Sequence, residues 1–347
     1  MSRLRRFSSF QPHELAYSRP GLDPAKNQVH APLVYHEKYS FANWPENHTF
    51  PMNKFARIAH ALTKSLVQDH THFFRPLDFQ DMIATGWLSG PIDAIFVERF
   101  LEGQLTVEEC RRIGFREQTS RPELIERTVL EVAGTVLACQ LACQWGLAAN
   151  VAGGTHHASM TRGAGYTILN DLAVAAHVLP KQRVLIVDCD VHQGDGTAQF
   201  GDENGPLHGK LITLSLHCQS NYPQLKAHST IDVGLPDGLK DDDYMQALED
   251  AVEKAIRLYD PDFCIYNAGV DIYENDVLGR LKVSEPGIRR RDRYVLDKFV
   301  TTGIPIAATV GGGYDKDVDA LARRHAIVHE EAAFVWRKHK MWERGAR

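Results

Sequence analysis

The second half of the chain alternates between short apolar runs and longer amphipathic segments. The apolar runs predict strands at Ala148–Ala152, Val184–Val187, Leu211–Leu216, Phe263–Tyr266 and Ile304–Val310. These runs are nearly continuous in apolar residues rather than alternating, as is typical of parallel strands that helices cover on both faces. The pattern therefore favours a buried parallel sheet over a sheet with one face in water.

Helices are predicted between these strands. Residues 121–145 have the periodicity of a long helix, with Ser120 as its N-cap and a proline just inside. The segments 167–179, 243–259, 286–302 and 316–339 are long enough for crossover helices. Strand and helix in alternation predict a single α/β domain with a doubly wound, mostly parallel sheet. We expect this domain to span residues 31–340, after an irregular tail over residues 1–30.

Composition narrows the class of protein. The chain has 347 residues, of which 44% are hydrophobic, and a formal net charge of -5, which argues against a general phosphate-binding surface and direct nucleic-acid binding. The six cysteines form no CxxC pair, which favours reduced thiols and an intracellular protein. No apolar run predicts a membrane span. The arginine- and serine-rich N-terminus leaves a mitochondrion or plastid open beside the nucleus and cytoplasm.

Residues of a catalytic kind follow four of the predicted strands at once. These segments are Gly153–His157, Asp188–Gly196, Asn267–Asp271 and Gly311–Tyr314. In a doubly wound fold, ligands bind beyond the carboxyl ends of the strands. We therefore expect the four segments to meet at one edge of the sheet and to form one site.

Two aspartates and a histidine could bind a metal ion there. Asp190 and His192 are two residues apart, so in an extended segment their side chains point the same way. Asp271, from another strand end, is the candidate third ligand. Three ligands with one open position are typical of a catalytic zinc site. Alone, such a pair would more often cap the next helix; the other strand ends favour the metal site.

The adjacent His156 and His157 suit general acid–base catalysis, since a neutral imidazole accepts a proton and an imidazolium returns it. Each would need a carboxylate on its other ring nitrogen, and Asp188 and Asp195 are available. A His-His pair is otherwise often a surface doublet. The two glycines that precede it indicate close backbone approach at a crowded site.

Tyr314 follows three glycines, which let the backbone present its phenol into a cleft. The hydroxyl could donate a hydrogen bond to a developing oxyanion. A phosphate-binding glycine loop is the alternative. It is disfavoured because aspartates (Asp315 and Asp317), and no lysine-serine pair, come next.

These motifs together resemble the histone deacetylase family, more closely its class IV branch and related bacterial-type deacetylases. The matching stretches are GGTHHA (153–158), GYTILND (165–171), VDCDVHQGDG (187–196), LSLH (214–217), NAGVDIYENDVLGRL (267–281) and GGGY (311–314). The similarity runs from about residue 30 to residue 330. It implies zinc-dependent hydrolysis of the amide bond of acyl-lysine in a protein substrate.

The resemblance also implies roles for residues. One zinc ion would be bound by Asp190, His192 and Asp271; His157 would be the general base, His156 would place the water, and Tyr314 would donate to the carbonyl oxygen. Asp188 and Asp195 would orient the histidines. A structural potassium ion would lie at Asp188, Asp190, His192, Ser215 and Leu216. The acyl-lysine tunnel would be walled by Gly165, Tyr166, Tyr222, Leu278 and Gly312.

The sequence departs from the family pattern in two ways. The aspartate with which several members grip the substrate backbone has no clear match among Asp93, Glu98, Glu102 and Glu117. Tyr166 and Tyr222 stand where phenylalanine is common, so the tunnel is more polar. The preferred acyl chain length and assembly into an oligomer or complex stay open.

Three other classes of protein are alternatives. An arginase-like binuclear manganese hydrolase would need further bridging carboxylates, and Asp271 is followed by Ile272-Tyr273-Glu274 instead of a D-x-D motif. An acetylpolyamine amidohydrolase shares the chemistry and differs at the mouth of the tunnel. A scaffold that only binds acyl-lysine would be expected to lack the base, a ligand or the tyrosine.

Overall fold

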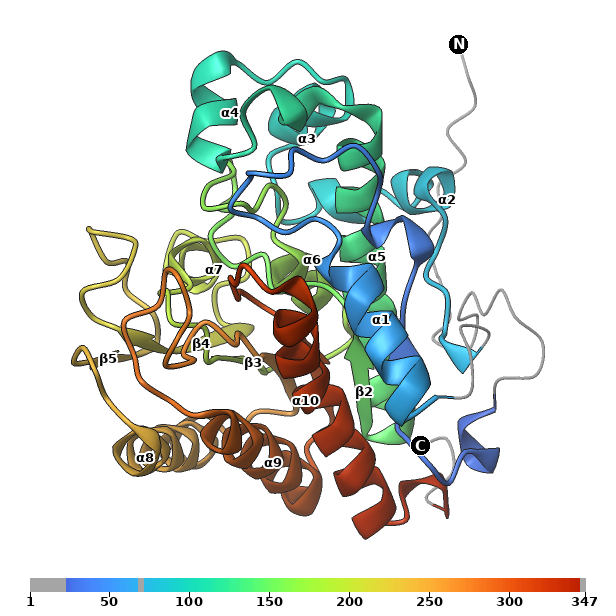
Figure 1. Ribbon diagram of the computed structural model, residues 1–347, viewed down its shortest axis with the longest axis vertical. Coiled ribbons are helices and arrows are strands. Elements are labelled where there is room, and N and C mark those ends of the chain that lie inside the picture. The colour runs from blue at the N-terminus through green and yellow to red at the C-terminus, as the bar shows by residue number, and fades with distance from the viewer. Residues whose placement is uncertain (1–22, 68–71, 344–347) are drawn as a thin grey trace.

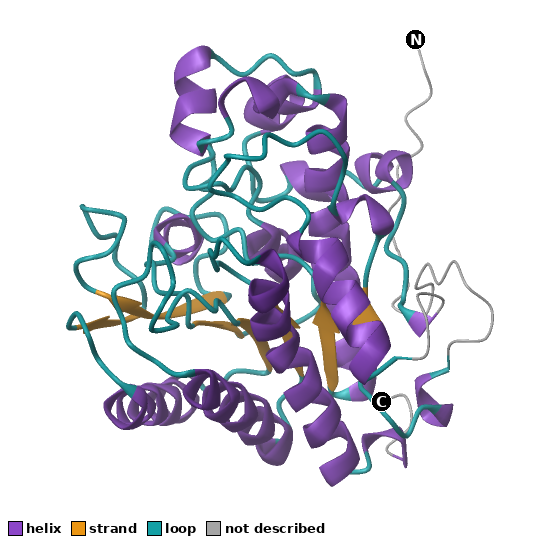
Figure 2. Cartoon of the chain, in the orientation of Figure 1, coloured by secondary structure: helices purple, strands orange, loops and turns teal. Residues whose placement is uncertain are grey.

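A seven-stranded sheet forms the centre of the protein (Figure 1, Figure 2). The computed structural model describes residues 23–67 and 72–343. Every strand pairs in parallel with its neighbours, in the order β1-β2-β7-β6-β3-β4-β5. The strands are β1 (Leu33–Val34), β2 (Leu147–Asn150), β3 (Val184–Asp188), β4 (Leu211–Cys218), β5 (Ile231–Leu235), β6 (Phe263–Asn267) and β7 (Ile306–Thr309).

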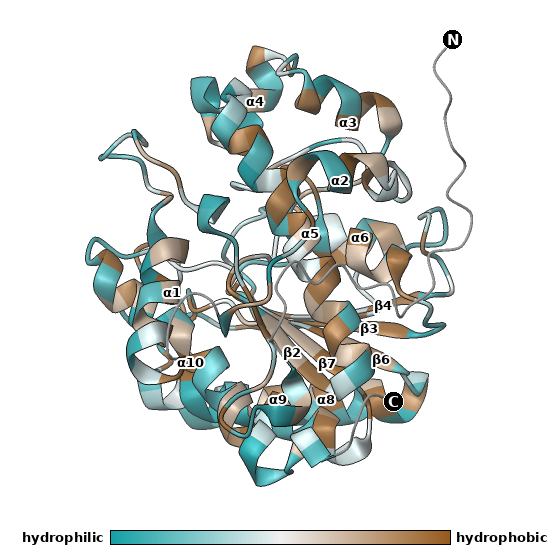
Figure 3. Cartoon of the chain, turned by 90° about the vertical axis from the view of Figure 1, so that its right-hand side faces the viewer, coloured by the Kyte–Doolittle hydropathy of each residue, from teal (hydrophilic) through white to brown (hydrophobic). Residues whose placement is uncertain are grey.

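Helices cover both faces of this sheet. They are α1 (Lys54–Ser65), α2 (Phe79–Ala84), α3 (Ala94–Leu101), α4 (Val107–Ile113), α5 (Pro122–Trp145), α6 (Asp171–Val178), α7 (Asp195–Gly201), α8 (Asp241–Tyr259), α9 (Glu285–Thr302) and α10 (Val318–Lys338). Helices α8, α9 and α10 lie on one side of the sheet and α5 and α6 on the other (Figure 1, Figure 3). Among the described residues, no helix is long and apolar enough to cross a bilayer.

The predicted α/β class and parallel sheet are confirmed. All five predicted strands are present as β2, β3, β4, β6 and β7, with ends that differ by up to two residues. The strands β3 and β6 are buried along their whole length, as their continuous apolar sequences predict. Figure 3 shows the same distribution, with hydrophobic residues on the strands and on α5 and hydrophilic ones on outer helices and loops.

Some local predictions were wrong. Ser120 does not cap α5: it ends the preceding 3-10 helix, and Arg121 takes the N-cap position without a side-chain hydrogen bond. Pro122 does open the helix. The strands β1 and β5 and the helix α7 were not predicted. Of the predicted irregular tail, residues 1–22 lie outside the described residues, and Pro24–Lys26 form a 3-10 helix.

Strand register brings polar residues together at the carboxyl edge of the sheet. Asp188 ends β3 opposite Ser215 of β4 on one side and Asn267 of β6 on the other. Asn267 in turn pairs with Thr309 at the end of β7. All four side chains are buried. The loops that leave these strands therefore start side by side, which places their residues at one site.

Candidate active site

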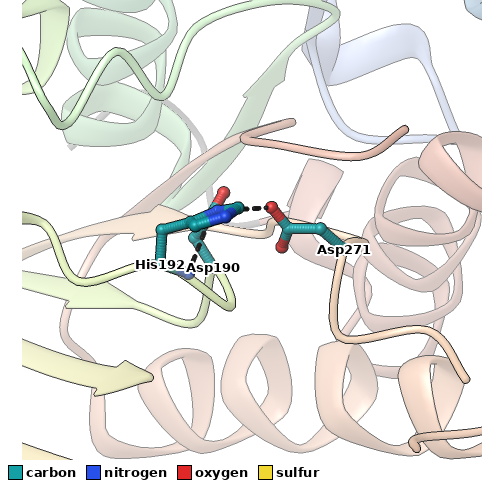
Figure 4. Close-up of side chains that lie close together, drawn as sticks. All are labelled: Asp190, His192 and Asp271. Carbon is teal, nitrogen blue, oxygen red and sulfur yellow. Dashed lines mark hydrogen bonds and ion pairs between the residues drawn. The ribbon is translucent and has the colours of Figure 1, made fainter. Parts of the chain in front are cut away.

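The side chains of Asp190, His192 and Asp271 converge above this edge (Figure 4). Nδ1 of His192 lies 3.0 Å from Oδ1 of Asp190 and 3.1 Å from Oδ2 of Asp271. One potential ligand atom from each residue lies within 4.8 Å of the other two, and all three side chains are buried. Two residues from the loop after β3 and one from the loop after β6 thus meet at one point.

Backbone amides orient the two carboxylates. The N–H of Gly312 donates to Oδ2 of Asp190 at 2.7 Å, and the N–H of Val191 donates to Oδ1 of Asp271 at 2.8 Å. The second oxygen of each carboxylate faces the ring of His192, and Oδ1 of Asp190 also accepts the N–H of His192 at 3.0 Å. A Cβ at Gly312 would lie 2.3 Å from Asp271 Oδ2, so only glycine fits against this cluster.

Two buried carboxylates in contact favour a positive charge beside them. Burial, and then the charge of Asp190, raises the pKa of Asp271 to about 7. Burial alone would lower the pKa of His192, but its hydrogen bonds to the two carboxylates raise it to about 10. Oxygen and imidazole nitrogen donors are the set that zinc prefers in catalytic sites. A divalent cation at this point would supply the charge that two buried carboxylates need.

Two histidines lie beside this cluster. A carboxylate orients each ring through its Nδ1. Nδ1 of His156 lies 2.7 Å from Oδ2 of Asp188, and Nδ1 of His157 lies 2.6 Å from Oδ1 of Asp195. Both rings therefore keep Nε2 for the site. The glycines before them allow this placement, since Gly154 has a φ of +91° and a Cβ there would lie 2.7 Å from the backbone of Gly311.

The two imidazoles differ in protonation. Burial would lower the pKa of His156, but the charges of Asp188 and Asp190 outweigh it and raise that pKa to about 9. Burial, and then the charge of His156, lowers the pKa of His157 to about 4. Neighbouring groups whose environments separate their pKa values in this way are typical of an acid–base pair. His157 is the one that is neutral near pH 7.

Tyr314 lies in the same cavity as these histidines. It is buried, and burial, followed by the charge of Asp271, raises the pKa of its hydroxyl well above the usual value. The phenol therefore stays protonated and can donate a hydrogen bond. Its ring lies 6.0 Å from that of Tyr166, which has a φ of +63° and packs against Phe115.

The remaining tunnel positions lie around the same histidines. Tyr222 packs edge-on against His157, with ring centroids 4.8 Å apart, and is 46% exposed. Leu278 is 38% exposed. Gly165 lies against the His157 ring, where a Cβ would come within 2.5 Å of Cδ2. Gly165, Tyr166 and Gly312 line the same cavity as His157, whereas Leu278 is linked through its carbonyl oxygen to Asn221, the residue before Tyr222.

The cavity is small and contains charged residues that the sequence did not single out. It encloses about 40 Å³, and its lining includes Lys54, Arg127 and Glu131. Arg127 donates to Glu131 at 2.7 Å, and both are buried in α5. An Arg and a Glu one turn apart inside an apolar helix could have indicated a buried ion pair from the sequence. Lys54 carried none; burial, and then Arg127, lowers its pKa to about 8.

The positions predicted for potassium lie on β3, β4 and the loop after β3. Asp188 accepts hydrogen bonds from Asn267 at 2.9 Å and from the N–H of Asp190 at 3.2 Å. Ser215 lies opposite Asp188 in the sheet, with its Oγ 3.0 Å from Nδ1 of His217. Asp93, one of the acidic residues considered for binding the substrate backbone, instead caps α3 by accepting the N–H of Phe96.

Known proteins are similar to this chain in sequence. The model of the histone deacetylase domain family matches residues 93–330. Histone deacetylase 2 of Arabidopsis thaliana is 30% identical over 307 residues, which cover 82% of this chain and 74% of that protein. An uncharacterized protein of Picosynechococcus sp. is 40% identical over 309 residues, covering 88% and 99%. The chain belongs to the histone deacetylase family.

Solved structures agree on the fold. The crystal structure of the HDA15 HD domain matches with a TM-score of 0.67 at 19% sequence identity, over 92% of this chain and 96% of that one. At this level of identity the match supports the α/β architecture alone. Membership of the family supports a hydrolase of the histone deacetylase type, and the structural match confirms the fold predicted from the sequence.

Proposed function

We propose that the chain is a zinc-dependent hydrolase that cleaves the amide bond of N-acyl-lysine in proteins. The observation that carries this proposal is that Asp190, His192 and Asp271 lie close enough together to bind one metal ion. They do so beside the cavity that His157 and Tyr314 line. When bound by the first three, a zinc ion supplies Lewis acidity toward a carbonyl oxygen and lowers the pKa of water toward about 7. The class IV assignment stays a prediction.

The other residues have separate roles in this proposal. His157, neutral through burial, accepts the proton of the attacking water at Nε2 and later returns it to the lysine amine. His156, charged through its contact with Asp188, stabilises the negative charge that develops beside it. Tyr314 donates a hydrogen bond from its hydroxyl to the carbonyl oxygen as that oxygen becomes an anion.

The tunnel residues would bind the methylene chain of lysine. Tyr222 and Leu278 present apolar surface at the solvent side, and Tyr166 and Gly165 lie deeper, beside Tyr314 and His157. An apolar sleeve excludes water from the reacting amide and strengthens each hydrogen bond within it. A potassium ion at Asp188, Asp190, His192, Ser215 and Leu216 would hold the ends of β3 and β4 together, which is a structural role.

A substrate comparison tests this function. Purified protein loaded with zinc is assayed on an acetyl-lysine peptide and on an acetylated polyamine, before and after a chelator removes the metal. We expect hydrolysis of the peptide that stops on chelation and returns with zinc. Turnover that is indifferent to the chelator would overturn the zinc mechanism. Turnover of the polyamine in preference to the peptide would overturn the substrate class.

A further inference from the structure

The carboxylate of Asp276 links its own loop, which also carries Leu278, to the loop that carries Tyr314. One oxygen, Oδ2, accepts the N–H of Tyr314 at 2.8 Å. The other, Oδ1, accepts the N–H of Leu278 at 2.8 Å and that of Gly279 at 2.9 Å. Three backbone donors from two loops are therefore satisfied by one side chain, which is 9% exposed.

Further hydrogen bonds run between the same two loops. The N–H of Val277 donates to the carbonyl oxygen of Tyr314 at 3.3 Å, and the N–H of Val270 donates to that of Gly312 at 2.7 Å. The loop after β6, which carries the metal-ligand candidate Asp271, is thus joined to the loop after β7. Among the described residues, Asp276 is the side chain that accepts the N–H of the tyrosine itself.

A third loop is attached to this pair. Asn221, directly before Tyr222, donates from Nδ2 to the carbonyl oxygen of Leu278 at 2.8 Å and accepts the N–H of Arg280 at 3.1 Å. The segment 276–280 therefore lies between Tyr314 and Tyr222. A shift of that segment would move the hydrogen-bond donor and two walls of the tunnel together.

We propose that Asp276 is the positioning residue for Tyr314, an inference that rests on the proposed function. It does not touch substrate. Its carboxylate holds the backbone N–H of Tyr314, so that the phenol stays within hydrogen-bond distance of the carbonyl oxygen during the reaction. A donor placed in advance needs no reorganisation when charge develops, whereas a displacement near 1 Å can slow catalysis about 100-fold.

The chemistry of the contact identifies the variant. An asparagine at position 276 has the same size, but its NH₂ group would face a backbone N–H that needs an acceptor. An amide oxygen on the Oδ1 side keeps the two donors Leu278 and Gly279, so we expect Asp276→Asn to lose the contact with Tyr314 and to leave the segment 276–280 in place. The exposed Asp243, in the first turn of α8, offers a control of equal charge, Asp243→Asn, which should keep the wild-type kcat.

The experiment compares zinc-loaded wild type, Asp276→Asn, Tyr314→Phe and the double variant on acetyl-lysine and trifluoroacetyl-lysine peptides. The trifluoroacetyl oxyanion is less basic and depends less on a hydrogen-bond donor. We expect Asp276→Asn to lower kcat on the acetyl peptide by about 10-fold or more, with KM and zinc content nearly unchanged. The loss should be smaller on the trifluoroacetyl peptide. The double variant should be no slower than Tyr314→Phe alone.

Other results separate the two hypotheses. If Tyr314→Phe slows the wild-type reaction and Asp276→Asn does not, or if their losses multiply, the positioning role is wrong while the proposed function stands. If Tyr314→Phe has no effect, the proposed function itself is wrong. Should Asp276→Asn fail to fold, Asp276→Ser, whose hydroxyl can accept one N–H, takes its place with the same expected pattern.

Discussion

Nδ1 of His157 lies 2.6 Å from Oδ1 of Asp195, and this contact decides which ring nitrogen can act as a base. A carboxylate only accepts, so the proton of the neutral imidazole stays on Nδ1 and Nε2 keeps its lone pair. The buried ring is thereby held in the tautomer that can accept a proton from water.

Two substitutions test this relationship. His157→Ala should lower kcat by roughly 100-fold or more, because it removes the base. Asp195→Asn should also lower kcat, since an asparagine NH₂ group can donate to Nδ1 and move the ring proton to Nε2. Steady-state kinetics on an acetyl-lysine peptide measure both. Equal rates for Asp195→Asn and wild type would show that the contact does not set the tautomer.

The carboxyl ends of the strands could be predicted from the sequence because buried parallel strands are continuous apolar runs. Val184–Val187 and Phe263–Tyr266 have such runs, and Asp190 and Asp271 follow them at short distances. Strand register then brings the two aspartates together. The site was predictable to this extent because parallel strands place their loops at one edge.

The missed elements lack such patterns. β5 is an edge strand with Asp232 and Gly234 in its centre, and β1 is two residues long, so neither has an apolar run. Helix α7 has only seven residues, and two of them are Gly196 and Gly201, which are poor helix formers, so its sequence has no helical pattern. Lys54 comes from a distant helix and reaches the cavity through tertiary packing, which no local pattern encodes.

The size of the cavity predicts the acyl group. About 40 Å³ leaves room for about three water molecules, so a long acyl chain would have to displace the walls further than an acetyl group would. We expect kcat/KM to be highest for acetyl-lysine and to fall by about 10-fold or more for octanoyl- and myristoyl-lysine peptides. Phe50→Leu, which shortens a buried wall residue, should narrow that difference. Faster turnover of myristoyl-lysine by the wild type would contradict this prediction.

The backbone at Gly154 should tolerate no side chain. Its φ of +91° is strained for other residues, and a Cβ would lie 2.2 Å from Asn267 Oδ1. Gly154→Ala should therefore displace the His156 segment and lower activity by about 10-fold or more. Gly238→Ala is the matched control, since Gly238 also has a positive φ but no atom within 4 Å. Similar losses in both variants would indicate that backbone strain, and not the contact, is responsible.

A buried histidine in α10 should make the fold sensitive to acid. Burial lowers the pKa of His329 to about 4, against the contribution of its contact with the carbonyl oxygen of Asn150 at 3.2 Å. Between pH 6.5 and about 4 the unfolded chain takes up a proton that the folded chain does not. The free energy of unfolding therefore falls as the pH falls through this range, by up to about 1.4 kcal/mol per pH unit from this residue.

Urea unfolding of wild type and His329→Gln across that range measures the effect. The variant should lose less stability per pH unit than the wild type, whatever its stability at pH 7. His208→Gln, at an exposed histidine, serves as the control and should keep the wild-type slope. Parallel slopes for wild type and His329→Gln would show that His329 titrates alike in the folded and unfolded chain.

The zinc content of wild-type protein and Asp190→Ala, measured after dialysis against trace zinc, tests the central claim most directly. Because Asp190, His192 and Asp271 supply all three proposed donors, the wild type should retain about one zinc ion per chain and Asp190→Ala close to none. Equal zinc retention by the two proteins would contradict the proposed metal site and the mechanism built on it.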